Sequence, residues 1–283
     1  MKVNEFSDMF DTLLNSYANK AEFGDQTSGA DIALDEYEKS VILTQAQDVI
    51  VKSYFDKTLN NQGQGFDDSA RRQVDFSSLI KVDTITAQSD SGEAFDERGI
   101  IFKLPCKQGD KLTPEDEGYD PEQDKYKETN TTTVLFILNE KLQLITTEGE
   151  GNEAKTTKTD YVIVPINYRE YDREMSKAYA QPLKKQAWRL FQNAGTGFDV
   201  LSEIIPIFNL KDKGDFQYRI RYVRRPQPIV VAELPDGLSV DGETKVSECE
   251  LNPILHMDIL NKAVEIALTT RGRVARPTQS NNQ

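Results

Sequence analysis

The segment DFQYRIRYVRRPQPIVV, residues 215–231, decides how the middle of this chain folds. Aromatic and apolar residues stand at every second position from Phe216 to Tyr222, and mostly polar residues, including Arg219 and Arg221, stand between them. Successive side chains of a strand point to opposite faces, so this spacing predicts a β-strand with one aromatic face and one cationic face. Proline cannot donate a ladder hydrogen bond, so the strand should end before Pro226, and a short second strand is expected at 229–231.

The cationic face raises the question of what its arginines contact. Arginine pairs bidentately with carboxylates, so we expect Arg219, Arg221, Arg224 and Arg225 to meet acids of this chain's own loops or of a neighbouring subunit. Arg169 and Arg173 stand four residues apart on a helix expected within residues 167–179. These six arginines form the predicted subunit interface.

Charge is distributed unevenly in this acidic chain of formal net charge −13. Residues 1–160 carry 17 basic and 32 acidic residues, a net charge of −15, whereas residues 161–225 carry 12 and 7, a net charge of +5. Three interpretations remain open: solvated faces, head-to-tail association of copies through opposite charges, or nucleic-acid binding by the block 161–225. Nucleic-acid binding usually needs a larger basic excess than this.

Length and composition predict a soluble globular protein. Its 283 residues are enough to bury a full core, in one large domain or two small ones, and 37% of them are hydrophobic and 29% charged. No run approaches the roughly 18 apolar residues of a membrane span, so no membrane partner is expected. No signal peptide is evident, which predicts synthesis and assembly in a cytoplasm, where Cys106 and Cys249 should be free thiols.

The N-terminal region reads as helical. Residues 4–20 place apolar side chains at helical spacing, with Asn4 or Ser7 as the predicted N-cap. A second helix is expected to begin near Thr44, because Thr-Gln-Ala-Gln at 44–47 resembles a capping box. Residues 39–43 fit either a strand or an earlier turn of helix, and a short helix is expected at 67–76.

From Lys81 the hydrophobic period changes to two, which predicts strands. The acidic stretch 107–130 contains Pro114, Gly118 and Pro121 and is predicted to be a surface loop. A hairpin is expected to turn at Asn139-Glu140-Lys141. The strands are expected near residues 82–85, 100–104, 132–138, 142–147, 160–166, 184–192 and 200–206.

The chain is predicted to close with a helix and a tail. Asn252 should cap that helix, with Pro253 at its first position and Leu255 and Ile259 in its buried stripe. The fold class is therefore α+β: N-terminal helices, a central mostly antiparallel β-sheet and a closing helix. The predicted regions of this one structural domain are 1–80 (helical), 81–250 (β), 251–270 (helix) and 271–283 (disordered tail).

The sequence offers little for catalysis. His256 is the one histidine, stands alone on the closing helix, and is expected to be an ordinary surface or half-buried residue. No second His or Cys lies at metal-ligand spacing, and no phosphate-loop, dinucleotide or nucleophile-elbow motif occurs. The carboxylates between Glu115 and Asp124 lack the register of a calcium loop. We expect no enzyme activity, no cofactor and no metal site.

Several segments together resemble a structural protein of crAss-like tailed bacteriophages of gut Bacteroidales. They are LTQAQDVIVKSYF, DYVIVPINYREYDREMSKAYAQPLKKQAWRLFQ, YRIRYVRRPQPIVV and ECELNPILHMDILNKAVEIAL, and the similarity covers roughly residues 35–80 and 160–270. The resemblance implies a ring protein of the neck or connector at the head–tail junction of a short-tailed virion, stacked between portal and tail and commonly present in twelve copies. The family has no catalytic motif, so no functional residue carries over.

That resemblance makes the expected partners other copies of this chain, the portal protein and neighbouring ring or tail proteins. Genomic DNA would pass through the lumen without specific binding. A ring needs two different complementary faces on each subunit, and the charge asymmetry supplies them. The alternative function is a nucleic-acid-binding accessory protein that uses the basic block 161–225.

Overall fold

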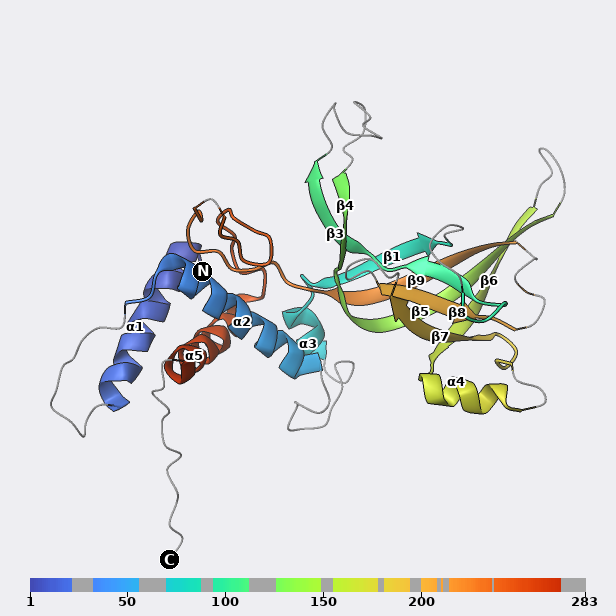
Figure 1. Cartoon of the computed structure of the whole chain (residues 1–283), viewed down its shortest axis with the longest axis horizontal. Coiled ribbons are helices and arrows are strands. Elements are labelled where there is room, and N and C mark those ends of the chain that lie inside the picture. The colour runs from blue at the N-terminus through green and yellow to red at the C-terminus, as the bar shows by residue number, and fades with distance from the viewer. Residues whose placement is uncertain are drawn as a thin grey trace, which may run out of the picture. The chain divides into compact units, whose positions relative to one another are not determined.

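The structure is a computed structural model of the whole chain, and it divides into two compact units (Figure 1). One unit combines Met1–Leu79 with Arg225–Gln283, and the other is Ile80–Arg224. The structure describes residues 1–21, 33–55, 70–87, 94–111, 126–148, 155–177, 181–193, 200–207, 210, 214–235 and 237–270. The predicted α+β fold class is confirmed, with N-terminal helices, a mostly antiparallel sheet and a C-terminal helix.

Helices dominate the first unit: α1 (Val3–Ala21), α2 (Glu36–Phe55), the short α3 (Ala70–Asp75) and α5 (Pro253–Thr270). α5 packs against both α1 and α2. Helix α1 buries Phe6, Phe10 and Leu14, which recur at the spacing of one helix face. The predicted cap at Asn4 or Ser7 is wrong, because both residues lie inside α1.

Helix α2 begins eight residues earlier than the sequence predicted. Its capping box is Asp35 with Glu38: the Glu38 amide donates to Asp35 Oδ1 at 2.6 Å, and the Asp35 amide donates to Glu38 Oε2 at 3.3 Å. Thr44 is instead a buried mid-helix residue whose hydroxyl oxygen accepts the Ile229 amide at 3.1 Å. The ambiguous residues 39–43 are therefore helical.

Helix α5 follows its predicted boundaries. The Ile254 amide donates to Asn252 Oδ1 at 3.2 Å, which confirms the cap, and Pro253 is the first helical residue. Leu255, Ile259 and Ala263 are buried as expected. The tail after Thr270 and the predicted helix residues Asp67 and Asp68 lie outside the described residues.

Between the sheet and α5 the chain packs on the helices as extended segments. Ile229, Val230 and Val231 are buried, but Val230 makes only an isolated antiparallel bridge with Ser247, so the strand predicted at 229–231 is wrong. Hydroxyl groups of α2 take the backbone bonds that a strand partner would have taken. The Val231 amide, for example, donates to Ser40 Oγ at 3.0 Å.

The second unit is a curled seven-stranded sheet with strand order β1-β9-β5-β6-β7-β8-β2 and a separate two-stranded ribbon, β3-β4 (Figure 1). All pairs are antiparallel except β6 with β7. The strands are β1 (Ile80–Thr86), β2 (Ile100–Lys103), β3 (Cys106–Lys111), β4 (Tyr126–Thr132), β5 (Val134–Glu148), β6 (Lys155–Pro165), β7 (Gln186–Asn193), β8 (Val200–Ile205) and β9 (Asp215–Arg224).

Strand β9 has the two faces that its sequence predicted. Phe216, Tyr218, Ile220 and Tyr222 are buried, whereas Arg219 and Arg221 are exposed. The aromatic face joins the main core, in which Phe102 and Tyr218 lie 5.4 Å apart between ring centroids. Strands from both ends of the sheet contribute to this core, so the sheet curls around it.

The hairpin predicted to turn at Asn139-Glu140-Lys141 is wrong. Strand β5 runs through these residues without turning and pairs with β9 from Val134 to Ile145. Register irregularities between Val134 and Phe136 and between Ile137 and Asn139 accommodate the polar residues. The segment lacks the glycine that a tight turn favours, and Glu140 makes interior contacts that a turn would forbid.

The structure also bears on the acidic stretch 107–130 and on the helix expected within residues 167–179. The acidic stretch 107–130 is not entirely a loop, because β3 and β4 occupy its two ends, and residues 112–125 lie outside the described part. The helix expected within 167–179 is α4 (Tyr168–Met175), capped by Asn167 and Glu170 in a capping box.

Candidate subunit-contact surfaces

The exposed face of strands β1, β9, β5 and β6 is the first candidate surface, here called the cationic face. Residues that stand directly opposite each other on neighbouring antiparallel strands have their side chains on the same side of the sheet. The strand register therefore shows which residues belong to the cationic face. Arg219 stands opposite Thr84 and Lys141, and Arg221 stands opposite Val82 and Asn139. Its basic members are Lys141, Lys158, Arg219 and Arg221, and its acidic members are Asp160 and Asp215.

The cationic face also exposes apolar area. Val82 and Val162 lie on it and are 53% and 62% exposed. Branched apolar residues beside arginines are typical of surfaces that another protein covers, because the core of an interface is depleted of other charges and enriched in arginine. The face therefore has the composition of a contact surface, and α4, the described helix of the sheet unit, does not cover it.

Asp160 is the acid that balances this face within the chain. Lys141 Nζ forms an ion pair with Asp160, and Gln143 Nε2 donates to its Oδ1 at 2.7 Å. These hydrogen bonds, together with the nearby charge of Arg219, lower the pKa of Asp160 below its usual value. Since this one carboxylate already accepts two donors, it neutralises Arg219 only in part.

Helix α4 covers the other half of the same side of the sheet. Its Tyr171 packs with Trp188, Leu190 and Ile205, and the register of β6 with β7 puts these residues on the side of Val162. Arg169 and Arg173 are exposed on α4. Arg173 lies 3.7 Å from Glu174, a distance typical of a weak surface pair.

The structure therefore brings together some of the six arginines singled out from the sequence. Arg219, Arg221, Arg169 and Arg173 lie on one side of the sheet unit. Arg224 is half-buried at the end of β9. Arg225 belongs to the helical unit, where its guanidinium forms ion pairs of 3.0 Å with both Asp48 and Asp241, acids of its own chain.

A buried network holds α4 and the 94–100 segment on the sheet. Arg98 Nη2 pairs with Asp96 at 2.5 Å, Tyr171 Oη donates to Asp96 at 2.9 Å, and the Asp96 amide donates to Glu203 at 2.8 Å. Burial opposes ionisation of Asp96, but the hydrogen bonds from Arg98 and Tyr171 outweigh it and lower its pKa to about 2. Burial and the bond to Asp96 raise the pKa of Tyr171 to about 12. Every member has a partner, which is the arrangement of a structural network.

A pocket of about 280 Å³ opens beside a buried ion pair in the same unit. Arg189 Nε lies 3.0 and 2.8 Å from the two carboxylate oxygens of Glu140, and Tyr218 Oη donates to that carboxylate at 2.5 Å. The guanidinium carbon of Arg189 lies 4.0 Å from the ring centroid of Phe191. Sequence reasoning missed this site, because the ion pair joins residues 49 positions apart. The pocket lining is Leu104, Thr132, Val134, Leu135, Phe136, Ile137, Arg189, Phe191 and Val200.

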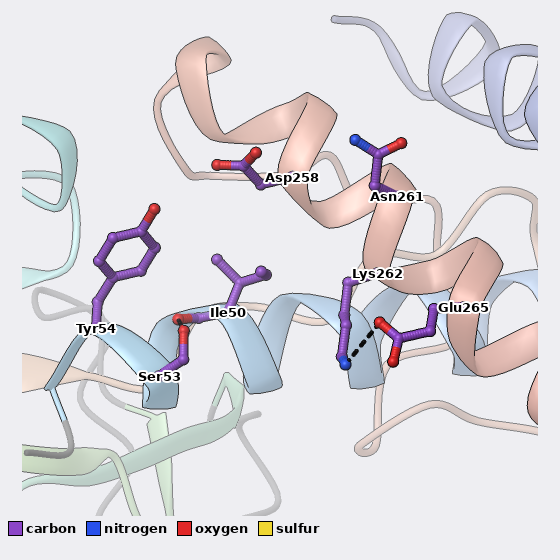
Figure 2. Close-up of a pocket in the computed structure, with 7 residues that line it drawn as sticks. All are labelled: Ile50, Ser53, Tyr54, Asp258, Asn261, Lys262 and Glu265. Atoms are coloured by element: carbon purple, nitrogen blue, oxygen red, sulfur yellow. Dashed lines mark hydrogen bonds and ion pairs between the residues drawn. The ribbon is translucent and has the colours of Figure 1, made fainter. Parts of the chain in front are cut away.

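The helical unit has an open groove of about 400 Å³ between α2 and α5 (Figure 2). Ile50, Ser53 and Tyr54 form its α2 side, and Figure 2 shows Asp258 and the Lys262–Glu265 pair on α5. The Lys262 and Glu265 side chains pair at 2.9 Å. The groove is polar and shallow, so we treat it as a second candidate contact surface.

The described residues hold no group of three or more histidines, cysteines and acids that could bind a metal ion. His256 is fully buried, whereas a surface or half-buried position was expected: its ring packs edge-on against Phe6 at 5.2 Å, and Nε2 lies 3.0 Å from the Leu251 carbonyl. Burial lowers its pKa. Cys106 and Cys249 are free thiols, as expected. The carboxylates between Glu115 and Asp124 lie outside the described part.

None of the described helices is both long and apolar enough to cross a bilayer.

The described residues thus combine exposed candidate contact surfaces with buried polar networks and a buried histidine. A sequence model of the family described as "Phage tail ring protein 3/4" matches residues 1–109 and 120–279, so the chain belongs to that family of phage structural proteins.

Two relatives agree with the family assignment. The chain is 37% identical over 271 residues to "Ring protein 4/5" of Bacteroides phage crAss001, covering 94% of this chain and 92% of the relative. It is 28% identical over 271 residues to "Ring protein 3" of the same phage, covering 96% of both chains. The resemblance to structural ring proteins of crAss-like phages is thereby confirmed.

Proposed function

We propose that this chain forms a cyclic ring of twelve copies in the neck or connector between portal and tail of a short-tailed phage. The ring is a non-enzymatic part of the conduit for the genome, and DNA passes through its lumen without specific binding. The chain assembles in the host cytoplasm and remains in the virion at the head–tail junction. The observation that carries the proposal is the match of nearly the whole chain to a ring-protein family.

The contacts of the ring follow from the charge on the subunit. A closed ring requires two different faces that complement each other. We assign one of them to the cationic face with Arg219 and Arg221, extended by Arg169 and Arg173 on α4 and by Arg224 at the end of β9. The partner face is acidic, since residues 1–160 carry a net charge of −15. Opposite charges orient such contacts and speed their formation.

The proposed location and copy number can be tested on purified virions. Antibodies against this chain should label the head–tail junction in negative-stain images. Quantitative mass spectrometry should give twelve copies, or a multiple of twelve, per particle. A chain that is absent from the particle, or that labels the capsid surface, would contradict the proposal.

The alternative function is a nucleic-acid-binding accessory protein, which the exposed Arg219 and Arg221 could serve through phosphate contacts. Base stacking is not open to the aromatic residues of β9, because Tyr218 and Tyr222 are buried on the opposite face. Salt-dependent DNA binding by the isolated chain, with a slope that falls when Arg219, Arg221 and Arg224 are replaced, would favour this alternative.

A further inference from the structure

The pocket beside Arg189 lies where the sheet splits. Strand β6 pairs with β5 only from Lys141 onward, and β6 pairs with β7 from Val162 to Pro165. In the described part of the chain, the first half of β5 therefore has β9 on one side and no strand on the other. Leu135 and Ile137, both half-buried, line the pocket along this side. An apolar strand edge of this kind is normally covered by another segment.

Arg189 determines what kind of segment the pocket would accept. The residue is only 8% exposed, and Nε is the atom that pairs with Glu140. No hydrogen bond to its two terminal nitrogens is found among the described residues, and neither nitrogen is a buried atom without a partner, so both are open to the pocket that Arg189 lines. Guanidinium donors that are open to a pocket can bind a carboxylate, which matches their geometry best. The pocket therefore suits a carboxylate on an extended segment with apolar neighbours, such as those that could contact Leu135 and Phe191.

One segment of this chain has the required chemistry. Residues 112–125, between β3 and β4, contain Glu115, Asp116, Glu117, Asp120, Glu122 and Asp124, with Leu112 and Tyr119 among them. We propose that this acidic tip of one copy docks in the Arg189 pocket of the next copy in the ring. The proposal rests on the ring function proposed above and identifies a second contact between its subunits.

The ribbon that carries the tip favours a contact between copies. Strands β3 and β4 form a two-stranded sheet of their own with irregular register, and Figure 1 shows them rising from the curled sheet. Such an isolated ribbon is marginally stable in water unless something packs on it. The pocket-lining residues Leu104 and Thr132 lie at the base of the ribbon. Strand β3 is six residues long and therefore spans about 20 Å.

Peptide binding to the full chain tests this contact. The probe is a fluorescent peptide of residues 110–127, and fluorescence anisotropy is recorded with the intact chain and with a chain whose residues 112–125 are replaced by a glycine–serine linker. Both chains should bind the peptide equally. Changing its seven acids to amides, or introducing Val200→Trp to fill the pocket, should weaken binding about tenfold or more.

Two further variants keep the result interpretable. Val162→Trp places the same bulk on the exposed cationic face and should leave peptide binding unchanged. Arg189→Lys retains the charge beside Glu140 but removes the planar fork, so it should weaken binding without unfolding the chain, as circular dichroism would show.

Three results would overturn the proposal. The first is that the peptide does not bind at millimolar concentration. The second is that neither the amide peptide nor Val200→Trp weakens binding. The third is that the peptide binds only to the chain that lacks its own tip, which would place the tip in its own subunit's pocket. None of these results bears on whether virions contain twelve copies at the head–tail junction, so the two proposals fail separately.

Discussion

At the scale of single residues, the interior of the sheet unit depends on one buried ion pair. The side chains of Arg189 and Glu140 are 9% and 8% exposed, and Tyr218 donates to the same carboxylate. Contact with the Glu140 carboxylate also raises the pKa of Tyr218 above its usual value, after the larger effect of burial. Removing one partner of a buried pair leaves the other charge uncompensated, whereas removing both can be nearly neutral.

Glu140→Gln should therefore lower the free energy of unfolding by about 3–5 kcal/mol, because Arg189 keeps its charge without a carboxylate. Urea unfolding followed by circular dichroism measures this change. Asp160→Asn breaks the exposed Lys141 pair and serves as the control, with an expected loss of about 1 kcal/mol or less. Equal losses for Glu140→Gln and Asp160→Asn would contradict this role. It would also be contradicted if adding Arg189→Met to Glu140→Met did not raise the free energy of unfolding above that of Glu140→Met alone.

Asp96 should give the sheet unit a distinct sensitivity to acid. Its folded-state pKa of about 2 lies below the ordinary 3.8, so its stabilisation is complete above pH 4 and is lost as pH falls toward 2. The shift corresponds to about 2 kcal/mol. Denaturant midpoints measured at pH 7, 4 and 2 should show Asp96→Asn less stable at pH 7 and less dependent on pH below 4. An unchanged acid dependence would argue against the network with Arg98 and Tyr171.

At the scale of elements, helix α2 and the extended segment after the sheet stabilise each other through side-chain hydroxyl groups. Thr44 Oγ1 accepts the Ile229 amide at 3.1 Å, and Ser40 Oγ accepts the Val231 amide at 3.0 Å. All four residues are buried. These bonds explain why Ile229–Val231 can be buried without a strand partner, since each hydroxyl satisfies a backbone donor.

Thr44→Val preserves shape but leaves the Ile229 amide without its acceptor. The expected loss is about 1–3 kcal/mol, and hydrogen exchange of the Ile229 amide should become faster. Thr269→Val is the matched control, because the Thr269 hydroxyl donates to the Glu265 carbonyl on an exposed turn of α5. Slower or unchanged exchange at Ile229 would show that the hydroxyl does not protect that amide.

The elements also show where sequence reasoning succeeds. The strand β9 and the helices α1 and α5 were predicted because each buries one continuous face, and local periodicity reports such a face directly. The start of α2 was missed although Asp35 and Glu38 form a capping box, because Thr44 offered a competing one.

Strand β5 and the candidate contact sites show where sequence reasoning fails. Asn139, Glu140 and Lys141 have the polarity of a turn, but Glu140 is in the interior because Arg189 and Tyr218 supply its partners. Partners that distant in sequence leave no local pattern. The exposure of Arg219 and Arg221 was predictable by alternation, whereas the pairing of Arg225 with Asp48 and Asp241 depends on tertiary packing.

At the scale of the whole molecule, family membership and charge distribution support the same account. A ring protein must present complementary faces, and this chain combines a net charge of −15 in residues 1–160 with an exposed cationic face on its sheet. Exposed charge pairs add little to the stability of a single subunit. Their expected effect is therefore on association between subunits.

Charge reversal on the cationic face should impair assembly without unfolding the chain. Particles assembled with Arg219→Glu and Arg221→Glu should contain at least about tenfold less of this chain, since like charges would then face each other. Immunoblots of purified particles measure incorporation, and thermal melts of the isolated chain check folding. Lys245→Glu changes an exposed charge in the helical unit and should be incorporated normally. Normal incorporation of the double variant would remove this face from the assembly contacts.

Cryo-EM of the intact particle, with the chain placed by its density, tests the central claim most directly. The account predicts a cyclic ring between portal and tail in which Arg219 and Arg221 lie against carboxylates of a neighbouring subunit. A ring whose cationic face points to the channel or to solvent would contradict the contact. A particle without this chain would contradict the proposed ring at the head–tail junction.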